Sequence, residues 1–246
     1  MFKKILSSLI LFIAMISCIS YAANTSADQW QWCYSDTNTT WYFKPGSVIY
    51  DKKSNTAKVW DKYVTPNGID QESRIKIDFS NKTSQLIGYI NSAGNEVVSP
   101  KTNPNNAIGP GTPSEALANA VADQLKIPHI YKGGADRWQW FHSTDTESYY
   151  IATDATSYNT KTNLYSVWIK TIRTTNNSNY PLQYVFNFTN HTWGFASFNH
   201  MKPVEPDSWQ EIIYNGAYDL CKKLYGLPDK ESQIDNFGFL STQQTE

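Results

Sequence analysis

The sequence predicts an α+β protein made of two similar units, each an antiparallel β-sheet with one C-terminal helix. Three observations predict this class. The chain repeats itself; each copy holds β-branched and aromatic runs of strand length separated by turn residues; and each copy ends in an amphipathic segment with a helix N-cap. A chain of 246 residues is long enough for two small domains.

The repeat is clearest at the start of each copy. Residues 28–32 (DQWQW) recur as residues 136–140 (DRWQW), and the similarity continues without a gap to Val64 and Ile172. The second copy lacks part of the loop around residues 99–110, which is rich in Pro, Asn and Gly. We therefore expect a repeat at residues 28–127, a second at 136–226, a linker at 132–135 (KGGA) and a polar tail at 229–246.

The strands of the first copy follow from its residue types. Four β-branched and aromatic runs lie at residues 41–43, 57–64, 74–79 and 85–90. The segments between them carry the turn residues Pro45-Gly46, Pro66-Asn67-Gly68 and Asn81-Lys82-Thr83. Connections this short predict an antiparallel meander.

A helix is predicted at the end of each copy. Thr112 and Ser208 are hydroxyl N-caps, and each is followed three positions later by a glutamate, Glu115 or Glu211. Two recurring carboxylates could in principle serve a glycosidase reaction, but a Glu at this position caps its own helix, and we interpret both as caps. The apolar stripes that would face the sheets are Leu117, Val121 and Leu125 in the first helix and Ile213, Ala217, Cys221 and Leu224 in the second.

The first 22 residues are typical of a secretory signal peptide. Lys3 and Lys4 precede an apolar run over residues 5–19, and residues 20–22 (SYA) form a small-x-small cleavage site. A lipoprotein signal ending at Cys18 is the alternative, and only then do we expect contact with a membrane. The expected location is the periplasm, the outer-membrane surface or the medium.

Removal of residues 1–22 leaves two cysteines, Cys33 and Cys221. An even number of cysteines in an exported protein predicts a disulfide between them. The alternative is two separately buried thiols, because Cys33 aligns with Phe141 and Cys221 with Leu125, which are apolar.

Composition and motifs exclude several functions. A net charge of −1 disfavours nucleic acid as a partner. The histidines are scattered without metal-ligand spacing, and the sequence has no Gly-x-Ser-x-Gly and no phosphate-binding glycine loop. We therefore predict no catalytic residues, no metal and no cofactor.

Tryptophan is the more informative residue. Trp60 and Trp168 alternate in phase with Lys62 and Lys170, so one sheet face in each copy mixes tryptophan with charge. These tryptophans could form a platform for a protein partner or a stacked sugar, together with Trp30 and Trp138 and with the neighbouring Trp32 and Trp140. In the alternative interpretation the long loop or the packing of the two repeats buries these faces.

The order of motifs resembles a tandem duplication of the surface-adhesin protein E family of Gram-negative bacteria. The residues that carry the resemblance are Tyr42 before residues 45–49 (PGSVI), residues 57–63 (AKVWDKY) and 110–121 (PGTPSEALANAV), with Tyr150, residues 167–170 (VWIK) and 206–208 (PDS) before Glu211 in the second copy. The resemblance implies export, a β-rich fold capped by a C-terminal helix, and adhesion to host proteins. It carries over no ligand residues. Cys221 matches the family's helix cysteine, whereas Phe79 and Phe188 occupy the region of its strand cysteine.

The expected function is therefore that of an exported, non-enzymatic, adhesin-like protein that recognises a host or cell-surface protein. A periplasmic inhibitor or a carbohydrate-binding module using the same aromatic face is the alternative. A hydrolase with an unrecognised site is a distant third. The partner is a protein or a glycan.

Overall fold

The computed structural model describes residues 29–229 except 69, 176–178, 180 and 197–199. It is an α+β protein with two antiparallel sheets and two α-helices among the described residues, as the sequence predicts. The predicted signal peptide, Cys18 and the tail beyond Asp229 lie outside the described residues. The chain divides into two compact units, Met1–Ser80 with Gln85–Pro104, and Asn81–Ser84 with Asn105–Glu246. The predicted repeat boundaries differ from this division and remain a prediction.

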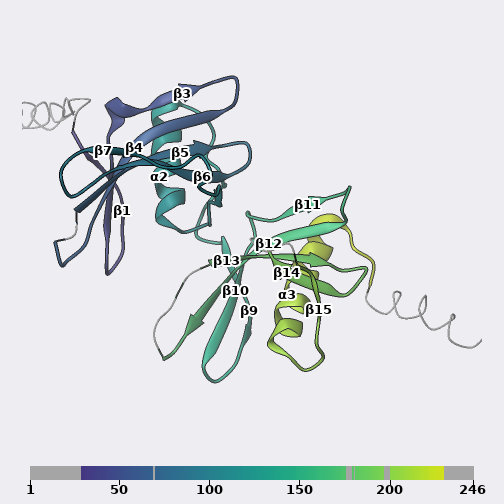
Figure 1. Ribbon diagram of the computed structural model, residues 1–246. Coiled ribbons are helices and arrows are strands. Elements are labelled where there is room, and N and C mark those ends of the chain that lie inside the picture. The colour runs from purple at the N-terminus through teal and green to yellow at the C-terminus, as the bar shows by residue number, and fades with distance from the viewer. Residues whose placement is uncertain (1–28, 69, 176–178, 180, 197–199, 230–246) are drawn as a thin grey trace, which may run out of the picture. The chain divides into compact units, whose positions relative to one another are not determined.

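The first sheet has eight strands in the order β1-β2-β4-β5-β6-β7, with β3 paired to β4 and β8 to β6 (Figure 1). A 3-10 turn, η1 (Pro45–Ser47), precedes β3. The strands are β1 (Gln31–Ser35), β2 (Thr40–Phe43), β3 (Ile49–Asp51), β4 (Thr56–Val64), β5 (Asp70–Asp78), β6 (Thr83–Ile90), β7 (Glu96–Val98) and β8 (Asn106–Ala107).

The second sheet has seven strands in the order β15-β14-β13-β12-β10-β9, with β11 paired to β12. The strands are β9 (Trp138–Ser143), β10 (Glu147–Ala152), β11 (Ser157–Asn159), β12 (Leu164–Arg173), β13 (Pro181–Asn187), β14 (Thr192–Phe195) and β15 (Lys202–Pro203). The path β1-β2-β4-β5-β6 of the first sheet thus has its counterpart in β9-β10-β12-β13-β14.

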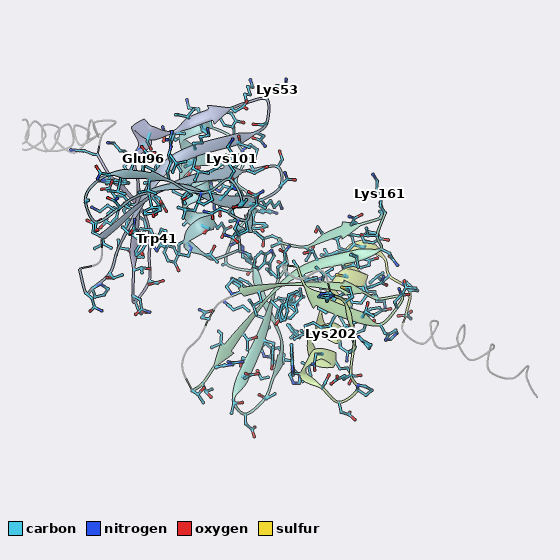
Figure 2. The ribbon with its side chains drawn as sticks, viewed as in Figure 1. Trp41, Lys53, Glu96, Lys101, Lys161 and Lys202 are labelled. Carbon is cyan, nitrogen blue, oxygen red and sulfur yellow. The ribbon has the colours of Figure 1, made fainter. Side chains whose placement is uncertain are left out.

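Matching hairpins carry matching turn residues. Asn55 and Asn163 have φ angles of 50° and 55°, a left-handed conformation that asparagine tolerates better than most residues. The hydroxyls of Tyr50 and Tyr158 donate to their side-chain oxygens at 2.8 and 3.0 Å. Lys53 and Lys161, labelled in Figure 2, mark the tips of these two hairpins.

Both predicted helices are confirmed, α2 (Pro113–Leu125) and α3 (Trp209–Tyr225). Thr112 and Ser208 accept from the backbone N–H groups of Glu115 and Glu211, as the capping motif predicts. Each glutamate carboxylate also accepts a backbone N–H from the residue just before its N-cap, at 2.7 and 2.8 Å. The two glutamates therefore act as helix caps.

The core of the second unit lies between α3 and one face of the second sheet. Val167 and Ile169 of β12 are buried there with Ala217 and Cys221 of α3. The ring of Phe188 packs edge-on against Tyr214 and Tyr218 of the helix, with ring centroids 5.2 Å apart in each pair. The helix stripe predicted from the sequence is the one that is buried, apart from Leu224, which is 47% exposed.

The predicted disulfide between Cys33 and Cys221 is absent from the structure, in which both cysteines are free thiols. Cys221 is fully buried among apolar side chains of the second unit. Cys33, in the first unit, is half-buried and donates to the backbone oxygen of Trp41 at 3.5 Å. Burial raises the pKa of each thiol to about 12. Each cysteine thus occupies the place of an apolar residue in its own unit, which is the alternative that the sequence left open.

Candidate binding surface

The candidate surface is the face of the second sheet that points away from α3, called here the open face. On β12, Trp168 and Lys170 alternate with the core residues Val167 and Ile169, so they lie on the open face. Tyr150 lies directly opposite Lys170, and Trp140 lies directly opposite Tyr150. Aromatic and cationic side chains therefore neighbour one another across β9, β10 and β12.

Lys170 sits between two aromatic rings. Its Nζ is 4.5 Å from the centroid of the Trp138 ring and 5.3 Å from that of Tyr150, within the range of cation–π attraction. These three residues are called the lysine clamp. Burial lowers the pKa of Lys170, and no described residue forms an ion pair with it. The clamp therefore holds a cation without a counterion of its own.

The equivalent lysine of the first sheet is neutralised. Lys62 lies directly opposite Glu72, and its Nζ is 2.6 Å from the carboxylate of Asp70. The Nζ atom of Lys62 is also 5.8 Å from the centroid of the Trp30 ring. In the second sheet, Pro181 lies directly opposite Lys170, where the first sheet has Glu72 opposite Lys62. The residue aligned with Asp70 is Asn179. The second copy keeps the aromatic neighbour and loses both acids.

Trp168 does not belong to an exposed platform, because the chain before α2 covers it. It is 7% exposed, and a Cβ added at Gly109 would lie 3.1 Å from its ring. Its indole also hydrogen-bonds to the Tyr131 hydroxyl, which donates to the backbone oxygen of Ile108 at 2.7 Å. Trp168 is therefore buried by the preceding loop, as in the alternative interpretation of the sequence.

Three other tryptophans of the predicted platform, Trp30, Trp60 and Trp138, are half-buried. A Cβ added at Gly111 would lie 3.6 Å from Nε1 of Trp138, so loop packing reaches that edge of the indole. In the first unit, the guanidinium of Arg74 lies 6.0 Å from the Trp60 ring and pairs with Glu96 at 3.2 Å. The structure therefore brings Trp138 together with Lys170 and Trp30 together with Lys62, while Trp60 faces an arginine.

Among the described residues, the most exposed aromatic side chains are those of Trp32 and Trp140, called here the exposed indoles. They are 63% and 57% exposed, and each donates its indole N–H to a serine three residues later, Ser35 or Ser143, at 2.8 Å. This internal hydrogen bond fixes the indole and leaves its ring available for stacking. In the sequence, the signal for these two tryptophans is the recurring Trp-x-x-Ser spacing at residues 32–35 and 140–143.

A groove of about 540 Å³ also opens on the second unit. Its wall combines Trp168, Leu182 and Phe195 with polar side chains of the segment before α2. The polar lining residues are Thr83, Asn105, Asn106, Thr112, Ser114 and Gln183.

A buried ion-pair network fixes the chain next to Trp138. The Arg137 guanidinium donates two hydrogen bonds of 2.6 Å to the Glu115 carboxylate, and its Nε donates to Asp154 at 3.1 Å. Arg137 and Glu115 are 9% and 5% exposed. This role of Arg137 was not predicted, because its only signal in the sequence is that the first copy has Gln29 in its place.

Comparisons of the chain with family models, with curated proteins and with solved structures found no match. Within the described ranges, no group of three or more His, Cys, Asp or Glu side chains is placed to hold a metal ion. No helix in that part of the chain has the length and apolar character needed to cross a membrane.

Proposed function

We propose that this chain is an exported, non-enzymatic binding protein that recognises a cell-surface ligand through the aromatic sheet faces of a tandem duplication. The observation that carries the proposal is the pair of exposed indoles. Trp32 and Trp140 are the most solvent-exposed tryptophans described, and both have the same serine hydrogen bond. Large exposed aromatic side chains held in one orientation favour a surface that binds a partner.

The duplication rests on details that recur in both copies. Supporting features are the common strand path, the left-handed asparagines Asn55 and Asn163, and the capping glutamates Glu115 and Glu211. The expected export signal at residues 1–22 and the resemblance to the adhesin family support an adhesin-like role toward a protein or glycan at a cell surface.

The proposal is tested with the purified chain on a panel of matrix proteins and glycans, and with protease added to intact cells. For the panel member that the natural chain binds, we expect the affinity of the double variant Trp32→Ala, Trp140→Ala to be at least tenfold lower. The matched control is Val98→Ala, because Val98 is 77% exposed but aliphatic. Equal capture by all three proteins, or protection of the chain from protease on intact cells, would count against a surface-binding role.

A further inference from the structure

The lysine clamp indicates the chemistry of the ligand. Lys170 and its counterpart Lys62 each lie near a tryptophan ring, but only Lys62 has acidic neighbours. Its counterpart Lys62 has Asp70 at 2.6 Å and Glu72 directly opposite. Lys170 instead has Asn179 and Pro181 at these positions and forms no ion pair within the described part of the chain. The uncompensated cation favours an anionic group from outside the chain.

The surroundings of Lys170 favour a sugar as the carrier of that anion. Tyr150 lies between Lys170 and Trp140 in the strand register, so one ligand can reach the ammonium and the exposed indole together. The N–H of Trp140 is already used by Ser143, and what remains is an apolar ring surface. The hydroxyls of Ser143 and Ser148 lie 2.9 Å apart beside this ring and can exchange hydrogen bonds with sugar hydroxyls.

We infer that Lys170, Trp140 and Tyr150 form a subsite for a carboxylate-bearing sugar of an acidic polysaccharide. The carboxylate pairs with the Lys170 ammonium, and a sugar ring stacks on the Trp140 indole. This inference rests on the proposed binding function and narrows its ligand class. The first sheet lacks the subsite, because its lysine is already neutralised by Asp70.

Titration calorimetry with oligogalacturonate as the probe tests the inference. The full chain is expected to bind oligogalacturonate and to bind a neutral glucan at least tenfold more weakly, with affinity falling as salt is added. Lys170→Met removes the charge and keeps the aliphatic stem, and it should lower affinity at least tenfold. Lys62→Met is the matched control and should leave affinity unchanged.

A second variant keeps Lys170 in place. Asn179→Asp introduces an acid at the exposed position that aligns with Asp70, the residue that neutralises Lys62 in the first copy. It should weaken oligogalacturonate binding about as much as Lys170→Met does. Unchanged affinity in both variants would overturn the inference, as would tighter binding of polyglutamate than of oligogalacturonate. If acidic sugars fail but another panel ligand still depends on Trp32 and Trp140, the inference is wrong and the proposed function stands.

Discussion

The ring of Phe141 occupies the space that a side chain at Gly216 would need. An ideal Cβ built on Gly216 would lie 2.3 Å from Cδ2 of Phe141, so strand β9 packs directly against the backbone of α3. In the first copy the aligned residues are Cys33 and Ala120. At these aligned positions the second copy thus has a large strand residue with a helix glycine, and the first copy has a smaller strand residue with a helix alanine.

This packing predicts that Gly216→Ala destabilises the protein, although alanine favours a helix more than glycine does. We expect the free energy of unfolding to fall by about 1–3 kcal/mol, because the ring must leave its position. The double variant Phe141→Cys, Gly216→Ala imitates the first copy and should recover part of this loss. Urea denaturation of the natural chain, Gly216→Ala, Phe141→Cys and the double variant measures the coupling, and purely additive effects would contradict it.

The Arg137–Glu115 pair predicts a large loss of stability when one partner is removed. Arg137→Met leaves the buried Glu115 carboxylate and Asp154 without their cation, and we expect about 3–5 kcal/mol of destabilisation. In Arg137→Met, Glu115→Gln the uncompensated carboxylate at position 115 is gone, so the loss should be smaller. Thermal and urea unfolding check both, with the exposed pair Arg74 and Glu96 as a control whose disruption changes stability by less than about 1 kcal/mol.

The sequence predicts local features of this protein better than distant ones. The helix starts at Thr112 and Ser208 depend on hydrogen bonds within four residues, and both were predicted. The burial of Trp168 depends on Gly109, which is remote in the chain, so alternation along β12 could not reveal it.

The charge difference between the two copies is visible in the sequence, but its consequence for Lys170 was not predicted. Asp70 and Glu72 in the first copy and Asn179 and Pro181 in the second are visible in the sequence. Their meaning depends on the structure, which places Asp70 at 2.6 Å from Lys62 and Pro181 directly opposite Lys170. Strands β1, β3, β7 and β8 of the first sheet were not predicted. Three of them, β3, β7 and β8, have only two or three residues, which give too little periodicity.

The two free thiols predict slow modification in the folded protein. Burial raises the pKa of Cys33 and of Cys221 to about 12, so almost no thiolate is present at pH 8. We expect neither cysteine to react with a thiol reagent in the folded chain and both to react in guanidinium without a reductant. Mass mapping of the labelled peptides identifies them. A linked Cys33–Cys221 peptide from the unreduced protein would establish the disulfide that the structure lacks.

The last prediction concerns Asp61, whose carboxyl is buried in the first unit. It lies on the same face of β4 as Ala57 and Val59, is 3% exposed, and has an Oδ1 atom with no hydrogen-bond partner among the described residues. The second copy has Ile169 at this position. Burial raises the pKa of Asp61 to about 7 from an ordinary value of 3.8, and the hydrogen bond from its own backbone N–H opposes this only in part.

Because the folded chain holds this proton more tightly than the unfolded chain, the free energy of unfolding should fall as the pH rises. The fall begins near pH 4, where the unfolded carboxyl ionises, and ends above about pH 7, where the folded carboxyl has ionised as well. Its size is on the order of 4 kcal/mol. Asp61→Asn has no proton to lose, so the difference in stability between this variant and the natural chain should change with pH over that window and stay constant above it. Urea denaturation between pH 4 and pH 9 measures both proteins, and parallel pH profiles would show that folding does not raise the pKa of Asp61.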